Sequence, residues 1–263
     1  MSQWNTIRGR YGSDDGEISD VRIDKSTDTI QTIEYEHHEI HANSHYFLEG
    51  FVALGNTETL DFCVTAPPVE EAHVKFAYKS SLKTEFRLYE GTDFDADGTL
   101  AVQFGNNRAQ CHSGYHTPVG SSATVMTDAN ATFVVDALIG WKIYNITDGS
   151  YGIITDNDGT TVTVASLTGG TDNDWDTGDQ YEINQSLTTI TTDATVNIII
   201  GVLIASSTGG SGTNPSTGEP GGSERVDEII LKPGVKYMWR FTSGAASNTL
   251  SYKAEWYEHT PKH

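Results

Sequence analysis

Apolar and polar residues alternate along much of the chain with the two-residue period of a β-strand. Val74, Phe76 and Tyr78 are separated by single charged or small residues, and Phe86 and Leu88 repeat the pattern. No stretch of a dozen residues carries the apolar stripe of an amphipathic helix. The pattern therefore predicts an all-β protein built from half-buried strands.

Two alternating strands near the end of the chain, 236–241 and 250–256, flank a short turn of Ser, Gly, Ala and Asn. Tyr237, Trp239 and Phe241 share one face of the first strand, and apolar residues of the second strand occupy the face that would meet them. This arrangement predicts an aromatic β-hairpin.

Three other segments depart from simple alternation. Residues 1–22 are polar and rich in Gly and Asp, which predicts a flexible arm that orders only against a partner. Residues 196–204 form a nearly continuous apolar run of mostly β-branched residues, which predicts a strand buried on both faces. Residues 206–223 are a Gly/Ser-rich stretch that is either mobile or a contact arm that orders on assembly.

Residues 122–185 have the pattern of a self-contained module. Turn signals recur in it about every ten residues, at Asp148-Gly149, Asp158-Gly159, Gly169-Gly170 and Gly178. They predict a small barrel or rolled sheet of five or so short strands. The expected architecture is one antiparallel, jelly-roll-like β-sandwich, formed by 23–121 and 186–263, with this module inserted in a loop.

Composition narrows the possible partners. The 263 residues carry a formal charge of −20, which argues against nucleic-acid binding because phosphate contacts need Lys and Arg. A halophilic source would also explain the acidity. No apolar run approaches the ~20 residues of a membrane span, and the first residues lack the apolar core of a signal peptide, so we expect synthesis in a cytosol and no membrane contact.

Only two cysteines occur, Cys63 and Cys111. In a reducing compartment we expect free thiols that pack as small hydrophobic groups, although a disulfide formed after lysis stays open. No second C-x-x-C pair accompanies them, so they do not form a metal-ligand pattern.

Several short motifs resemble one family. The "LKPG" at 231–234, the "WYEH" at 256–259, the segment 36–47 (EHHEIHANSHYF), and "LYEG" at 88–91 followed by "NNR" at 106–108 resemble the strands of tailed-phage head proteins of the decoration, or cement, type. Asn43 stands where that family carries glycine, and Asn also tolerates a positive φ. The ending of the inserted segment, "GGTDNDWDTGDQYEI", resembles a small module of phage structural proteins.

The resemblance implies a virion structural protein, often a homotrimer, that bridges and stabilises capsid subunits on the outer surface of a phage head. Its partner would be the major capsid protein, and its negative charge would suit a surface that faces away from packaged DNA. The candidate contact residues are aromatic, basic or histidine side chains near the two ends of the chain: Trp4, Arg8, Arg10, Tyr11, Trp256, Tyr257 and His259.

Two weak metal-site patterns are present. On a strand, His37, Glu39 and His41 would share one face suited to zinc or nickel, or would simply form a polar strand edge. Asp93, Asp95 and Asp97 begin like a calcium loop, but Phe104 occupies the twelfth position, which excludes an EF-hand. A looser calcium site and a solvated acidic turn both stay open, and we expect no resident cofactor.

No nucleophile, zinc-protease or phosphate-loop motif is present, so we do not expect an enzyme. The alternative function is a head- or tail-fibre module that binds host surface carbohydrate by stacking aromatic rings on sugars. The candidates lie in the inserted module, where at least two of them must form the core: Trp141, Tyr144, Tyr151, Trp175 and Tyr181.

Overall fold

The computed structural model describes residues 8–10, 18–20, 23–24, 29–30, 35–94, 98–196, 199–209 and 223–260. The chain divides into two compact units, residues 1–38 and 39–263. The first unit holds two short antiparallel pairs, β1 (Arg8–Arg10) with β2 (Ile18–Asp20) and β3 (Ile23–Asp24) with β4 (Thr29–Ile30). The predicted arm 1–22 thus contains one strand pair, and most of its residues lie outside the described part.

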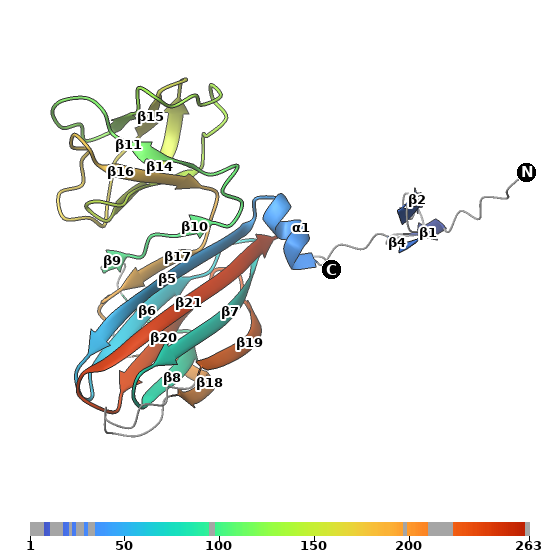
Figure 1. Ribbon diagram of the computed structural model, residues 1–263, viewed down its shortest axis with the longest axis vertical. Helices are drawn as coiled ribbons and strands as arrows, with labels where there is room; N and C mark the ends of the chain where they lie inside the picture. The colour runs from blue at the N-terminus through green and yellow to red at the C-terminus, as the bar shows by residue number, and fades with distance from the viewer. Residues whose placement is uncertain are drawn as a thin grey trace, which may run out of the picture. The chain divides into compact units, whose positions relative to one another are not determined.

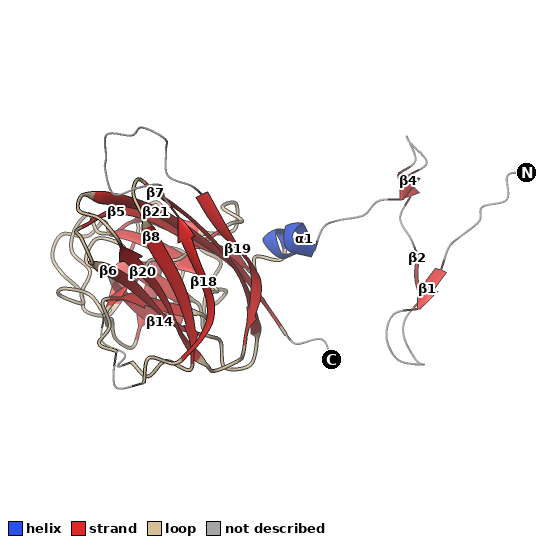
Figure 2. Ribbon diagram, turned by 90° about the horizontal axis from the view of Figure 1, so that it is seen from below, coloured by secondary structure: helices blue, strands red, loops and turns tan. Residues whose placement is uncertain are grey.

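Two antiparallel sheets form the body of the second unit (Figures 1 and 2). In spatial order, the five-stranded sheet consists of β10 (Phe104–Gly105), β5 (His45–Leu54), β21 (Asn248–His259), β7 (Glu71–Ser80) and β19 (Ser223–Leu231). The six-stranded sheet consists of β18 (Val202–Gly209), β8 (Thr84–Glu90), β20 (Lys236–Ser243), β6 (Thr59–Thr65), β17 (Thr189–Thr192) and β9 (Thr99–Leu100). The prediction of an all-β, antiparallel sandwich is confirmed.

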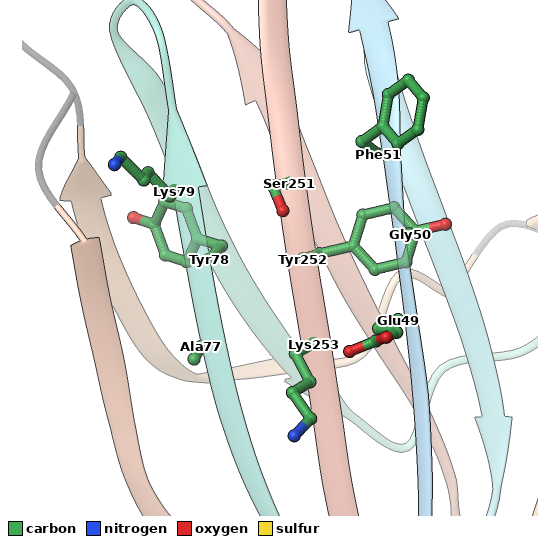
Figure 3. Close-up of a pocket in the computed structure, with 9 residues that line it drawn as sticks. All are labelled: Glu49, Gly50, Phe51, Ala77, Tyr78, Lys79, Ser251, Tyr252 and Lys253. Atoms are coloured by element: carbon green, nitrogen blue, oxygen red, sulfur yellow. The ribbon is translucent and has the colours of Figure 1, made fainter. Parts of the chain in front are cut away.

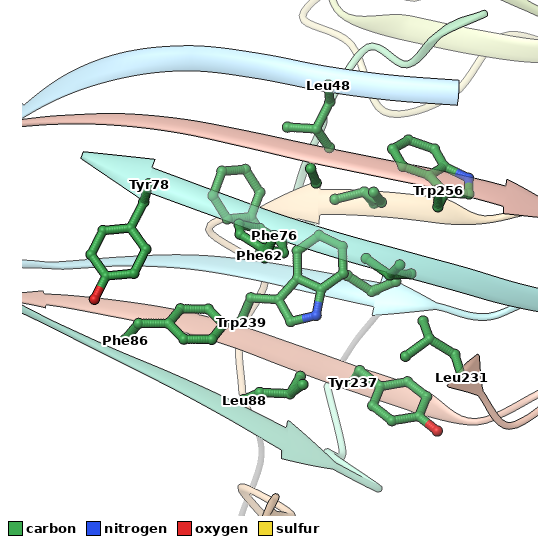
Figure 4. Packing of buried hydrophobic residues seen from close by; sticks show 14 of the residues in the cluster. Leu48, Phe62, Phe76, Tyr78, Phe86, Leu88, Leu231, Tyr237, Trp239 and Trp256 are labelled. Atoms are coloured by element: carbon green, nitrogen blue, oxygen red, sulfur yellow. The ribbon is translucent and has the colours of Figure 1, made fainter. Parts of the chain in front are cut away.

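The core lies between these two sheets and is largely aromatic (Figure 4). Val74, Phe76 and Tyr78 on β7 are buried, as their alternation predicts. Phe76 meets Trp239 of the opposite sheet edge to face, with ring centroids 4.3 Å apart. Each such side chain contributes roughly 1.5–3 kcal/mol by leaving water, so burial of these rings is a main source of the sandwich's stability.

The predicted hairpin of the last two strands is wrong, although its two aromatic faces do meet. β20 pairs with β6 and β8, whereas β21 pairs with β5 and β7, so the two strands lie in different sheets. The turn between them crosses the sandwich, and Trp239 and Trp256 both enter the shared core. Alternation identifies the buried face of a strand but carries no information about the neighbouring strand.

Asn248 fixes this crossing. It is buried directly after the turn, where its side-chain oxygen accepts from the backbone N–H of Leu82 at 2.8 Å and its amide donates to Thr84 Oγ1 at 2.7 Å. Leu82 lies in the β7–β8 connection and Thr84 begins β8, and this connection also passes from one sheet to the other. One asparagine therefore joins the two crossing turns.

The inserted segment forms a third sheet with its own core. Its spatial order is β11 (His112–Tyr115), β16 (Gln180–Asn184), β13 (Lys142–Asn145), β14 (Ser150–Asn157), β15 (Thr161–Val164) and β12 (Val125–Thr127), which we call the module sheet. Trp175 and Met126 are fully buried in its core. Strand β11, expected in the sandwich, pairs with β16 here, so this sheet begins at 112, before the predicted boundary at 122.

Residues 35–41 form a short helix, α1 (Tyr35–His41), where a strand was predicted. The helix is followed by Asn43, which has a φ of 63°, so asparagine does adopt the left-handed conformation expected of glycine at this position. The hydroxyl of Ser44 donates to the buried carboxylate of Glu39. These local contacts turn the chain into β5, which alternation alone did not reveal.

The predicted burial of the apolar run 196–204 is also wrong. Ile199, Ile200, Val202, Leu203 and Ile204 are all exposed. The last three begin β18, which lies at one end of the six-stranded sheet and pairs there with β8. The stretch predicted as a loop from Ser206 begins as strand up to Gly209, and residues 210–222 lie outside the described part.

Candidate functional site

A cluster of polar side chains lies on the outer face of the five-stranded sheet. Residues of β7 and β21 that point away from the core are cross-strand partners there, His73 opposite Tyr257 and Glu71 opposite His259. Glu228 of the neighbouring strand β19 joins them. We call Glu71, His73, Glu228, Tyr257 and His259 the histidine cluster.

Short contacts hold the histidine cluster together. The Nε2 atoms of His73 and His259 are 3.0 Å apart. Nδ1 of His73 lies 2.7 Å from Glu228 Oε1, to which the hydroxyl of Tyr257 donates at 2.8 Å. Burial opposes ionisation of Glu228, but the hydrogen bonds from His73 and Tyr257 outweigh it and lower the pKa of that carboxyl. Glu71, His73 and His259 bring one ligand atom each within 4.8 Å of one another.

The other end of the same sheet face carries an open depression of about 470 Å³ over β5, β21 and β7 (Figure 3). Phe51, 81% exposed, stands beside it, and Lys79 and Lys253 line it. Gly50 leaves space for the ring of Tyr252, because a Cβ there would come within 2.5 Å of the tyrosine oxygen. The depression is open and shallow, which suits contact with a surface better than enclosure of a small ligand.

A second exposed surface lies at the end of the six-stranded sheet. We call Ile199, Ile200, Val202, Leu203 and Ile204 the apolar edge. Val202 is 68% exposed and Leu203 is 49% exposed. The strand register shifts between Leu203 and Ala205, which interrupts the regular pairing with β8. Five consecutive or nearly consecutive branched apolar side chains at a sheet edge form the kind of surface that marks an interaction site.

The predicted contact residues fall into three groups. Trp256 and Tyr257 are buried, so we correct this expectation: they stabilise the sandwich and its outer face instead of offering free rings to a partner. His259 is half-buried and belongs to the histidine cluster. Trp4 and Tyr11 lie outside the described residues, and only the backbone of Arg8 and Arg10 is described, in β1.

The "WYEH" motif has a structural role through Glu258. This buried carboxylate accepts hydrogen bonds from Ser186 Oγ, the N–H and hydroxyl of Thr188, the N–H of Leu187 and the indole of Trp256. Residues 186–188 connect the module sheet to β17. Glu258 therefore fixes the point at which the chain returns from the module to the sandwich.

The "NNR" motif lies where the chain passes from the sandwich into the module, between β10 and β11. The guanidinium of Arg108 makes a two-pronged contact with the buried carboxylate of Glu182 on β16. Burial raises the pKa of Glu182, and the Arg108 guanidinium opposes this rise. Asn106 donates its backbone N–H to the carbonyl of His45, which joins the motif to β5. These contacts explain the motif residues by structure.

The predicted zinc pattern is not assembled as expected. The zinc pattern required a strand, but α1 places residues 37, 39 and 41 around a helix, and Glu39 is buried against Ser44. The side chain of His37, like Asp95 and Asp97, lies outside the described residues, so the calcium suggestion with Asp93 stays a prediction. Asp172, Asp174 and Asp176 form an acidic group in the module.

The carbohydrate alternative loses three of its five candidates. Trp175 and Tyr144 are fully buried, and Tyr181 is buried as well, so none of these rings can stack on a sugar. Trp141 and Tyr151 are half-buried. At least two aromatic residues were expected to form the module core, and Trp175 and Tyr181 do so.

Both cysteines are free thiols, as expected. Burial raises the pKa of Cys63 and of Cys111 to about 11. At neutral pH the thiols are therefore protonated and poorly nucleophilic. In the described part of the chain, no helix has the length and apolar character that crossing a membrane requires.

The histidine cluster is the main feature that sequence reasoning missed. Glu71-x-His73 and Tyr257-x-His259 each place two polar residues on one face of a strand, which is a readable signal. The two pairs are separated by more than 180 residues, and only the register of β7 against β21 brings them together.

Comparison with known proteins gives no family assignment. No model of a known protein family matches the chain. No curated protein matches it either. Among solved structures, the chain is similar to one described as "Structure of infectious bursal disease virus Gx strain", with 9% identity over 83% of this chain and 81% of that chain, at a TM-score of 0.23. A likeness at this TM-score carries no argument about function.

Proposed function

We propose that this chain is a structural protein of a tailed-phage head that binds the outer surface of the assembled capsid and bridges capsid subunits. The motifs at 36–47, 88–91, 106–108 and 231–259 support this proposal by their resemblance to phage decoration proteins. The β-sandwich is compatible with such a role, although many unrelated functions use sandwiches.

The observation that carries the proposal is the apolar edge. Apolar patches of this kind on a soluble protein mark contacts with other macromolecules, because their exposure to water is unfavourable. The edge strand β18 also offers a sheet margin to which a partner could add main-chain hydrogen bonds. The partner we propose is the major capsid protein, whose repeated copies would bind one decoration chain at each lattice position.

The charge of the chain supports an outward position. A formal charge of −20 is repelled by packaged DNA and favours a surface that faces solvent. Binding to assembled shells in preference to free subunits would stabilise those shells by mass action. We further propose a homotrimer, which light scattering would detect as three times the 28.6 kDa mass of one chain.

The experiment is a binding measurement with capsids that lack this chain. We expect the double variant Val202→Asp/Leu203→Asp to bind capsids at least tenfold more weakly than the unmodified chain. Both side chains are exposed, so the fold should be retained and its unfolding midpoint nearly unchanged. Unchanged binding of a folded double variant would contradict the proposal.

A matched control introduces the same charge elsewhere. Val119 is 97% exposed and Val134 is 72% exposed, and both lie in loops outside the strands. The variant Val119→Asp/Val134→Asp should bind capsids as the unmodified chain does. Light scattering of each variant separates loss of the trimer from loss of the capsid contact.

A further inference from the structure

The two imidazoles of the histidine cluster face each other through the same ring nitrogen. His73 Nε2 and His259 Nε2 are 3.0 Å apart, and the two ring centroids are 4.7 Å apart. His73 is largely buried, with 12% of its side chain exposed. Two ring nitrogens at this distance need either a proton or a cation between them.

The opposite nitrogens of the two rings lie beside hydrogen-bond acceptors. His73 Nδ1 is 2.7 Å from the carboxylate of Glu228, and His259 Nδ1 is 2.8 Å from the backbone carbonyl of Thr260. Carboxylate and carbonyl oxygens accept hydrogen bonds, so each Nδ1 carries the proton. In a neutral imidazole with a protonated Nδ1, the Nε2 holds the lone pair.

Two neutral rings would therefore direct their lone pairs at each other across 3.0 Å. This contact is repulsive unless a positive charge lies at the site, either a shared proton or a metal ion. Glu71 supplies a carboxylate oxygen within 4.8 Å of both histidine ligand atoms. Two imidazoles and a carboxylate form a donor set that binds zinc in proteins.

The distances fit a metal ion of this size. Zinc binds histidine nitrogen at about 2.0–2.1 Å, so two such nitrogens on a tetrahedral ion are roughly 3.3 Å apart. The observed 3.0 Å needs an opening of only a few tenths of an ångström. The carboxylate of Glu228 beside His73 is also the usual kind of partner for a metal-binding histidine, because it fixes the orientation of the ring.

We propose that Glu71, His73 and His259 bind a divalent transition-metal ion of the zinc type. Glu228 and Tyr257 are positioning residues that hold the ring of His73. Three protein ligands leave a fourth position open to water or to a group from a partner. The ion would join the carboxy-terminal end of β21 to the start of β7. Because all three ligands belong to this chain, the proposal does not depend on the proposed capsid function.

The test is zinc binding by the metal-free full-length chain, followed by calorimetry and by elemental analysis after dialysis. We expect one zinc ion per chain and a rise in the unfolding midpoint. His259→Ala should abolish this binding. Glu71→Gln, which keeps the size of the side chain, should weaken it at least tenfold. Magnesium, which prefers oxygen ligands, should not compete.

Two further variants separate this site from other histidines. The pair His38→Ala/His41→Ala alters α1 and should leave zinc binding unchanged. Glu228→Gln should weaken zinc binding about tenfold while the stoichiometry stays at one, because loss of such a supporting carboxylate typically costs 10–100-fold. Absence of zinc binding would overturn the proposal and leave a shared proton between the rings. Full binding by a folded His259→Ala variant would overturn it as well.

Discussion

The carboxylate of Glu258 accepts hydrogen bonds from both the backbone N–H and the hydroxyl of Thr188, at 2.9 and 2.6 Å. Glu258 lies in β21, and Thr188 lies in the segment that connects the module sheet to β17. Their contact joins the last strand of the sandwich to the segment through which the chain leaves the module. Together with the pairing of Arg108 and Glu182, it fixes both passages between module and sandwich.

Removal of the Glu258 carboxylate should therefore destabilise the protein strongly. We expect Glu258→Ala to lower the free energy of unfolding by about 3–5 kcal/mol, because several buried donors lose their acceptor at once. Urea denaturation at neutral pH measures this loss. Glu255→Ala, on the outer face of the same strand, is the control and should cost less than about 1 kcal/mol. A similar cost for both variants would contradict this role.

Lys142 should give the protein a distinctive pH dependence. Its ammonium group is buried and donates to the carbonyl of Thr188 at 2.8 Å. Burial lowers the pKa of Lys142 to about 8, against the opposing attraction of Glu258, from 10.5 for an exposed lysine. Between these values the unfolded chain binds more protons than the folded chain, so this contribution to stability increases as the pH rises.

The measurement compares the unmodified chain with Lys142→Met. Between pH 7 and pH 10.5, we expect the unfolding free energy of the unmodified chain to rise by about 3 kcal/mol more than that of the variant. Buried tyrosines such as Tyr46 and Tyr237, whose pKa values burial raises, destabilise both proteins above pH 10 and cancel in the difference. Parallel pH profiles for the two proteins would show that Lys142 is not buried as a charge.

The exposed and buried aromatic residues should respond very differently to truncation. Trp239→Ala removes a fully buried ring from the centre of the sandwich and should cost about 3–5 kcal/mol. Phe51→Ala removes a ring that is 81% exposed and should change stability by at most about 0.5 kcal/mol. Chemical denaturation of the two variants checks the packing of the sandwich. Equal costs would be incompatible with the observed burial.

Asn43 tests the turn that follows α1. Its φ of 63° is readily available to glycine and costly for alanine. Asn43→Gly should therefore be nearly neutral, whereas Asn43→Ala should lower the unfolding free energy by about 1–2 kcal/mol. The difference in thermal stability between the two variants measures the cost of the positive φ for alanine, since both variants lose the same side-chain amide. A more stable alanine variant would contradict the assigned conformation.

The sequence predicted the strands and their buried faces because alternation is a local property of the chain. It did not predict that β20 and β21 lie in different sheets, since pairing depends on distant segments such as β5 and β6. Residues 199–204 looked like a buried strand because hydrophobicity alone does not reveal whether a covering layer is present. The capsid partner that we propose would supply that layer.

The histidine cluster shows the same limit at the scale of a site. Glu71 and His73 lie at the start of β7, and Tyr257 and His259 lie at the end of β21. The spacing of these residues along the chain does not indicate that they are in contact, because the contact depends on the register of β7 against β21. The segment 36–41 instead suggested a metal site that required a strand, and this segment forms a helix.

The measurement that tests the central proposal most directly is the copy number of this chain in purified virions, determined by quantitative mass spectrometry against the major capsid protein. A decoration protein bound across the capsid lattice predicts a ratio near one chain per capsid subunit, or another large fixed fraction. A few copies per particle would contradict decoration and favour a fibre role. Absence from the particle would contradict any structural role in the virion.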